Sequence, residues 1–215
     1  MTIRITPSLA AAPLEHLSQT IGELADVGID GFHFDIEDGL FVPAMTLGIK
    51  VIGDLRPFTN LPFDVHLMIA NPEWMLPHVI KAGANRVSVH YEACSYPRRI
   101  LQSIVLHGAQ AGIALNPRTS LPDLRYLSPY LSFVVILSTE PEIKESPFLP
   151  NALEKVRAGK KTPGLEVIEW VVDGGVIPEN ISEIAEAGAD SVVVGRAIFR
   201  DNRIRDNLAA LRAAL

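Results

Sequence analysis

Hydrophobic and polar residues alternate clearly in the stretch GFHFDIE, residues 31–37. The phenylalanines and the isoleucine occupy every second position, and His33, Asp35 and Glu37 occupy the positions between them. Side chains in a strand alternate faces with period two, so one face is apolar and the other carries an imidazole and two carboxylates. The pattern predicts a strand buried on its apolar side, with three polar groups in one row.

A glycine recurs just before several such strands. VGID precedes GFHFD, AGAN precedes RVSVH and AGAD precedes SVVVG, and HGAQ before AGIAL is a looser copy. Each is typical of a glycine that ends a helix, followed by a short turn and a buried strand. Helical segments with apolar residues three and four apart precede these marks, as in Leu14, Leu17, Ile21 and Leu24.

The whole chain contains eight such strand segments, separated by helical segments. The strands are expected at residues 3–8, 31–37, 63–68, 86–90, 110–115, 133–137, 167–173 and 191–194. Eight βα units of this size favour a single (β/α)8 TIM barrel over an open doubly wound sheet. We therefore expect one domain, residues 1–215, with its active site at the C-terminal ends of the strands.

Composition and charge exclude several classes of function. The chain is 48% hydrophobic with a net charge of −6, and it has no Lys/Arg cluster, which argues against nucleic-acid binding. No run approaches the roughly 18 apolar residues of a membrane span, and no signal-peptide layout appears. The single cysteine, Cys94, fits a reducing compartment. We expect a cytoplasmic protein with no membrane partner.

The candidate chemistry lies at the ends of three strands. In PFDVHLM, residues 62–68, one face carries Asp64, His66 and Met68, and EWVVDGG ends its strand with Asp173. Together with the polar row of GFHFDIE, two imidazoles and two carboxylates converge on one end of the barrel. Such a set suits zinc, ferrous iron or manganese. Any one of these residues alone is more typical of a core polar group, but the convergence favours a metal site.

The chain resembles the ribulose-phosphate 3-epimerases over essentially its full length. The matching segments are PSL, HFDIEDGLFVP, LPFDVHLMIANPE, AGANRVSVHYEA, AGIALNP, VDGGV and AEAGADSVVVGRAIF. The resemblance implies that one divalent metal ion is bound by His33, Asp35, His66 and Asp173. It also implies that Asp35 and Asp173 double as the acid/base pair, and that the protein forms a homo-oligomer.

The residues suit the reaction that this resemblance implies, the epimerisation of D-ribulose 5-phosphate at C3 to D-xylulose 5-phosphate in pentose phosphate metabolism. The reaction needs two proton carriers on opposite faces of a planar enediolate and a cation for its negative charge. Phosphosugar decarboxylases of this barrel class carry D-x-K-x-x-D. The segment starting at Asp35, DIED, has no lysine, which argues against that relative.

Substrate contacts are expected on the same rim. Backbone groups of three glycines could hold a phosphate. Arg196, where the family usually has serine, either clamps an anion or points to solvent as a helix-start residue. The full set of expected substrate contacts is Ser8, His66, Met68, Gly174, Gly175, Gly195 and Arg196.

Two further departures from the family lie near the substrate. The glycine-rich loop NPGFGGQ of the family is replaced by EPEIKES at residues 140–146, where Lys144 could offset the glutamates. Glu37 stands where methionine is common; it either turns to solvent, pairs with Arg196 or Lys144, or bonds a substrate hydroxyl. Two alternatives therefore stay open: an epimerase or isomerase for another ketose phosphate or a sugar acid, and a noncatalytic metal-binding barrel.

Overall fold

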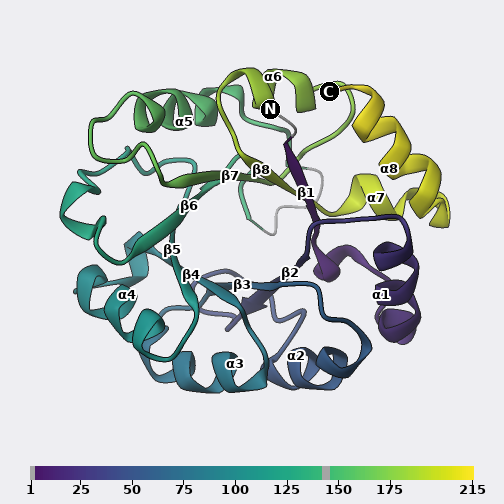
Figure 1. The fold of residues 1–215 in the computed structure, drawn as a ribbon, viewed down its shortest axis with the longest axis horizontal. Coiled ribbons are helices and arrows are strands. Elements are labelled where there is room, and N and C mark those ends of the chain that lie inside the picture. The colour runs from purple at the N-terminus through teal and green to yellow at the C-terminus, as the bar shows by residue number, and fades with distance from the viewer. Residues whose placement is uncertain (1–2, 142–145) are drawn as a thin grey trace.

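A computed structural model describes residues 3–141 and 146–215, which form a ring of strands surrounded by helices (Figure 1). The strands are β1 (Arg4–Pro7), β2 (Phe32–Glu37), β3 (Phe63–Met68), β4 (Arg86–His90), β5 (Gln110–Leu115), β6 (Leu131–Leu137), β7 (Glu169–Asp173) and β8 (Ser191–Val194). The helices are α1 (Leu17–Asp26), α2 (Ile49–Leu55), α3 (Leu76–Ala82), α4 (Pro97–Leu106), α5 (Leu153–Lys160), α6 (Ile181–Glu186), α7 (Arg196–Phe199) and α8 (Ile204–Ala213).

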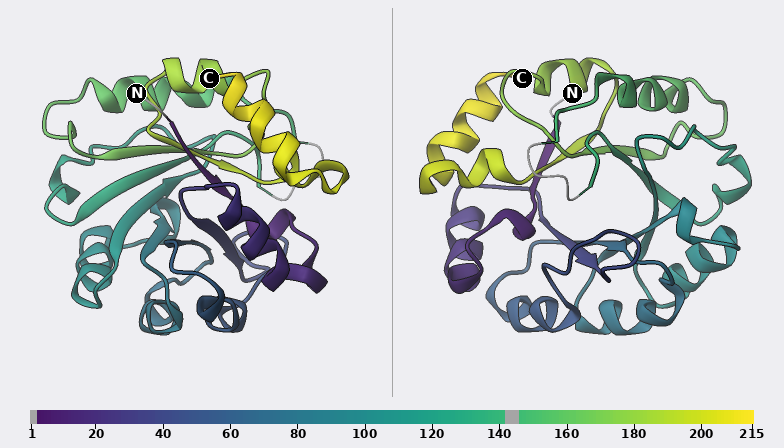
Figure 2. Two further views of the ribbon diagram at one scale, coloured as in Figure 1. Left: turned by 45° about the vertical axis from the view of Figure 1, so that its right-hand side comes forward. Right: turned by 180° about the vertical axis from the view of Figure 1, so that it is seen from behind.

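The strands form one parallel sheet that closes on itself. Its order is β1-β8-β7-β6-β5-β4-β3-β2, and a parallel bridge between Ser8 and His33 joins the two ends. Helices surround the strands on all sides (Figure 2). The predicted TIM barrel is confirmed. Four strands have the expected bounds; the other four differ by one or two residues at their ends, where the ladder hydrogen bonds rather than the apolar pattern set the limit.

The alternation along the strands sorts side chains between two cores. The apolar positions of β2 belong to the large cluster between strands and helices. Inside the barrel a separate cluster contains Ala114, Phe133, Val135, Val171 and Val193. The interior is tight: a Cβ on Gly112 would lie 2.4 Å from the Phe133 ring. The β5–β8 side of the interior is therefore filled with apolar side chains, and the polar row of β2 faces the same interior.

The two tryptophans differ in their environment. Trp170 is fully buried, and a Cβ on Gly159 of α5 would lie 1.9 Å from its ring, so glycine there makes room for the indole. Trp170 therefore packs between β7 and α5. Trp74, in contrast, lies in a 3-10 turn before α3 with 59% of its surface exposed, next to the His78 ring.

The helices of the barrel are short. The longest, α1, α4 and α8, have ten residues each. Among residues 3–141 and 146–215, none combines the length and the apolar character needed to cross a lipid bilayer. Each helix instead lies against the outer face of the barrel, as the ring in Figure 1 shows.

Candidate metal centre

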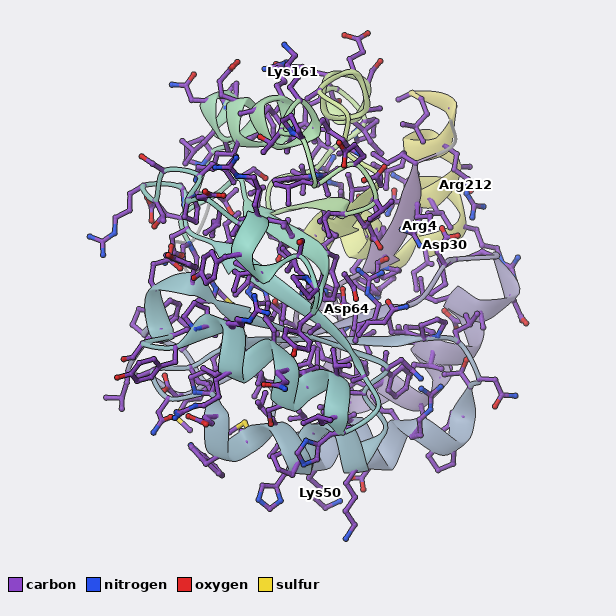
Figure 3. All side chains as sticks on the ribbon, turned by 60° about the vertical axis from the view of Figure 1, so that its left-hand side comes forward. Arg4, Asp30, Lys50, Asp64, Lys161 and Arg212 are labelled. Carbon is purple, nitrogen blue, oxygen red and sulfur yellow. The ribbon has the colours of Figure 1, made fainter. Side chains whose placement is uncertain are left out.

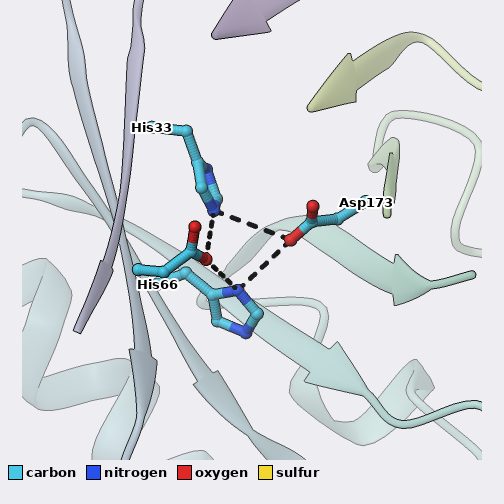
Figure 4. A group of neighbouring side chains, drawn as sticks. His33, His66 and Asp173 are labelled. Carbon is cyan, nitrogen blue, oxygen red and sulfur yellow. Dashed lines mark hydrogen bonds and ion pairs between the residues drawn. The ribbon is translucent and has the colours of Figure 1, made fainter. Parts of the chain in front are cut away.

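Four side chains from three strands meet inside the barrel. His33 and Asp35 come from β2, His66 from β3 and Asp173 from the end of β7. The parallel register pairs Asp35 with His66 directly across the β2–β3 ladder. Figure 4 shows the side chains of His33, His66 and Asp173 converging. The structure therefore brings together the four residues that the sequence predicted to converge.

The spacing of the four atoms fits a divalent metal ion. His33 Nε2 lies 3.1 Å from Asp35 Oδ1 and 3.7 Å from Asp173 Oδ2. His66 Nδ1 lies 3.4 Å and 3.5 Å from the same two oxygens, and all four atoms fall within 4.8 Å of one another. If four atoms about 3.4 Å apart form a tetrahedron, an ion at its centre lies roughly 2.1 Å from each of them; if they form a square, the distance is about 2.4 Å. Both values are close to the range of about 2.0–2.2 Å for zinc.

The electrostatics of the cluster also call for a cation. Burial lowers the pKa of His33, but the Asp35 and Asp64 carboxylates outweigh it and raise the pKa well above 6.5. Burial raises the pKa of Asp35, but His33 and His66 outweigh it and lower the pKa well below 3.8. The pKa of His66 is raised by Asp173 and Asp35 against burial in the same way. Buried positive charge is thus favoured at the position that a divalent ion would take.

The second nitrogen of the His33 ring has a carboxylate partner. His33 Nδ1 lies 3.2 Å from Asp64 Oδ2, and Asp64 in turn lies 4.0 Å from the Arg86 guanidinium. Burial raises the pKa of Asp64, but Arg86 and His33 outweigh it and keep the pKa below 3.8. Figure 3 shows Asp64 near the centre of the molecule, whereas Lys50 points outward from α2. Because an ionised carboxylate only accepts, His33 carries its proton on Nδ1 and turns Nε2 toward the other ligand atoms.

The second nitrogen of the His66 ring has a different partner, a third histidine. His66 Nε2 lies 2.9 Å from His90 Nε2, and His90 Nδ1 lies 3.3 Å from Glu92 Oε2. Burial lowers the pKa of His90 to about 4. Burial raises the pKa of Glu92, but bonds from His90, Thr119 and Asn116 lower it to about 2. His90 and Glu92 thus continue the hydrogen-bonded chain that begins at His66.

The two aspartates of the cluster line a cavity of about 960 Å³ at the C-terminal ends of the strands. Asp35 and Asp173 both reach it, with 15% and 13% of their side chains exposed. Ser8 also lines it and donates a hydrogen bond of 2.7 Å to Asp35 Oδ2, the carboxylate oxygen that does not face His33. Met68 lines the cavity beside these groups. One aspartate is thus oriented by a hydroxyl at the edge of the cavity.

The expected anion-binding residues line the opposite part of the cavity. Gly174 and Gly175 have φ values of +107° and +67°, and a Cβ on either would lie within 2.8 Å of Thr139. Gly195 and Arg196 lie on the same wall, and the Arg196 side chain is exposed. The glycines leave backbone groups accessible where a side chain would not fit.

Glu37 is buried against the loop that follows β2. It is only 5% exposed, and its Oε2 accepts a bond of 2.7 Å from the Thr46 backbone N–H in the loop after β2. The reading of Glu37 as a solvated rim residue is therefore wrong. Pairing with Arg196 is also wrong, because the two form no ion pair in the described chain. Lys144, the other proposed partner, lies outside the described residues.

Two cavity residues were not predicted from the sequence. Thr139 follows β6 and packs against the two glycines, and Arg200 lies four residues after Arg196 on the same wall. The sequence signal for Arg200 was a second arginine four residues after Arg196, although α7 ends at Phe199 and Arg200 lies just beyond it. Thr139 had none, since its contact with the glycines spans about 35 residues.

A family model and the named relatives of this chain point to the same family. The ribulose-phosphate 3-epimerase family model matches residues 4–199. The chloroplastic ribulose-5-phosphate-3-epimerase of Arabidopsis thaliana is 37% identical over 216 residues, covering 99% of this chain and 77% of its own. The ribulose-phosphate 3-epimerase of Bacillus subtilis is 34% identical over 215 residues, covering 99% of both chains.

Solved structures with lower identity share the fold. 3-Hexulose-6-phosphate synthase aligns with a TM-score of 0.67 at 18% identity, covering both chains completely. The 3-keto-L-gulonate-6-phosphate decarboxylase of Vibrio cholerae aligns with a TM-score of 0.72 at 16% identity, over 100% of this chain and 97% of its own. At such identities the likeness concerns the barrel alone. With 34–37% identity to named epimerases over nearly its whole length, the chain belongs to the ribulose-phosphate 3-epimerase family, a family of isomerases.

Proposed function

We propose that this protein epimerises a ketose phosphate at C3, with D-ribulose 5-phosphate as the favoured substrate and D-xylulose 5-phosphate as the product. The observation that carries the proposal is the buried group of two histidines and two aspartates at the floor of the cavity. The named relatives from Arabidopsis thaliana and Bacillus subtilis support the same assignment.

Asp35 and Asp173 are the proposed proton carriers. They project into one cavity from β2 and β7, which are separated by β1 and β8 in the closed barrel. Placement from two separated strands suits one carboxylate on each face of a planar enediolate. The lowered pKa of Asp35 keeps its carboxylate ionised, the form that can accept a proton. The Ser8 hydroxyl holds its outer oxygen in place.

The divalent ion is proposed to be held by His33, Asp35, His66 and Asp173. When bound, such an ion would polarise the substrate carbonyl and offset the negative charge that develops when the C3 proton leaves. The donor set of two nitrogens and two oxygens admits zinc, iron(II) or manganese. The Asp64 and His90 partners keep both rings in place with the nitrogens turned inward.

The phosphate is proposed to bind between the ends of β7 and β8. Gly174, Gly175 and Gly195 line that wall, and Arg196 lies next to them. Two arginines there, Arg196 and Arg200, also favour a second candidate, an epimerase or isomerase whose substrate is another ketose phosphate or a sugar acid. The homo-oligomeric state and the cytoplasmic location stay predictions.

The test is proton NMR in D2O with metal-loaded protein and a panel of ketose phosphates and sugar acids. We expect exchange at C3 of ribulose 5-phosphate and the appearance of xylulose 5-phosphate, with a higher kcat/KM than for any other member of the panel. Faster turnover of another member would replace the favoured substrate by the second candidate. Binding of metal without exchange in any member would contradict an epimerase function.

A further inference from the structure

The two metal-facing histidines are held by different means. His33 is held directly by the Asp64 carboxylate, whereas His66 meets a second imidazole, with 2.9 Å between the two Nε2 atoms. Both of these rings, His66 and His90, are fully buried. Two ring nitrogens at this distance form a hydrogen bond only if one carries the proton and the other presents a lone pair. The direction of this bond decides which nitrogen of His66 is free to bind a metal.

Glu92 decides that direction. Its Oε1 accepts the backbone N–H of Asn116 at 2.9 Å and the Thr119 hydroxyl, and its Oε2 faces His90 Nδ1 at 3.3 Å. An ionised carboxylate only accepts, so His90 carries its proton on Nδ1 and presents a lone pair on Nε2. His66 must then donate from Nε2. A neutral His66 ring therefore has no proton on Nδ1, the atom that faces Asp35 and Asp173.

We propose that Glu92 and His90 are positioning residues that fix, through two successive rings, the tautomer in which His66 presents a bare Nδ1 to the metal centre. Glu92 touches neither the metal ligands nor the cavity that they line. Its effect is transmitted by the direction of two hydrogen bonds. The inference rests on the metal centre of the proposed function, and adds to it a residue that controls metal binding without contact.

Replacing Glu92 by glutamine gives a sharp test, because the amide reverses the relay. The Asn116 N–H cannot rotate, so the amide oxygen must stay on its side and the NH2 group must face His90 Nδ1. His90 then takes its proton on Nε2 and donates to His66 Nε2. His66 is left with a proton on Nδ1, where the metal would bind. An alanine only removes the acceptor and lets a water molecule replace it.

The first experiment measures metal dissociation constants by competition with a chelator, using zinc. We expect Glu92→Gln to bind zinc about 10- to 100-fold more weakly than the unchanged protein, and Glu92→Ala to lose less. Glu73→Gln is the matched control, because Glu73 is an exposed glutamate on the same rim that pairs with Arg99; it should bind as the unchanged protein does. A merely structural role for Glu92 predicts the opposite order, with alanine the more damaging change.

The second experiment reads the tautomers directly, by nitrogen NMR of protein with labelled histidines. In the unchanged protein His90 should carry its proton on Nδ1, and in Glu92→Gln on Nε2. A proton on His90 Nε2 in the unchanged protein would overturn the proposal, as would equal zinc affinity in Glu92→Gln. This measurement can be made without metal at a pH above the raised pKa of His66, where the ring is neutral, so an absence of zinc binding would remove the metal centre but leave the relay tested.

Discussion

Two parts of the cavity differ in how their residues are held: the floor, formed by the cluster of His33, Asp35, His66 and Asp173, and the wall, formed by Gly174, Gly175, Gly195 and Arg196. On the floor, each metal-facing ring is buried and bonded to a buried partner, as His33 is to Asp64 and His66 is to His90. On the wall beyond Gly195, the Arg196 side chain is exposed and forms no ion pair within the described chain. Bonded partners fix geometry on the floor, whereas the wall leaves room for change.

This contrast matches the pattern of departures from the family. The floor keeps the four proposed ligand residues, while the wall carries Arg196 and, from the altered segment, Glu140, Pro141 and Ser146. A buried polar network loses several bonds when one member changes, because each partner is left unsatisfied. An exposed side chain can change with little effect on folding. The chemistry should therefore depend on the floor and the substrate preference on the wall.

Removal of metal should have the largest effect. A chelator is expected to abolish turnover and to lower the melting temperature, since an ion at 100 times its dissociation constant stabilises the folded state by about 2.7 kcal/mol. Calorimetry with and without zinc measures this. His66→Gln should lose the response to zinc, and His78→Gln, a change in an exposed residue of α3, should keep it. A full response in His66→Gln would place the ion elsewhere.

Asp64→Asn should have the next largest effect. An amide that turns its NH2 group toward His33 Nδ1 would shift the ring proton to Nε2, and the metal affinity is expected to fall about 10- to 100-fold. Competition with a chelator measures the affinity. Asp123→Asn, which changes an exposed aspartate paired with Arg125, is the control. Unchanged affinity in Asp64→Asn would mean that the floor does not need this partner.

The free energy of unfolding of the protein should depend on pH in opposite ways with and without metal. Without metal, the folded-state pKa of His33 lies well above 6.5, so the folded state holds more protons than the unfolded state and its stability is lost as pH rises through the raised pKa. With metal, the folded rings are unprotonated and stability falls as pH drops below about 6.5. Each ring contributes at most about 1.4 kcal/mol per pH unit. Denaturant titration on both sides of about pH 6.5 measures how the free energy of unfolding changes with pH, with and without metal. The same pH dependence in both states would contradict the assignment of ligands.

Arg196→Ser should have the smallest effect. It tests whether the wall contributes to substrate binding or to the chemical step. We expect KM for ribulose 5-phosphate to rise about 3- to 10-fold with kcat nearly unchanged, because an exposed arginine contributes equally to substrate and transition-state binding. Arg203→Ser is the control, since Arg203 is exposed and lies outside the cavity lining. A fall in kcat as large as the change in KM would assign Arg196 to the chemical step.

The fold and the four clustered residues could be predicted from the sequence because both rest on local regularities. Period-two alternation fixes which residues of β2 and β3 face inward, and parallel register then brings Asp35 opposite His66. The position of Glu37 could not be predicted, since it depends on an N–H nine residues away in a loop without a regular pattern. The same holds for His90, whose bond to His66 spans 24 residues.

The most direct test of the central claim is hydrogen–deuterium exchange at C3 in Asp35→Asn and Asp173→Asn, each loaded with metal and given each epimer separately. Two carriers on opposite faces predict that neither variant interconverts the epimers. Each variant should still exchange the C3 proton of one epimer, and the two should retain opposite ones. Exchange of the same epimer by both variants, or interconversion by either, would contradict the account of Asp35 and Asp173 as a pair.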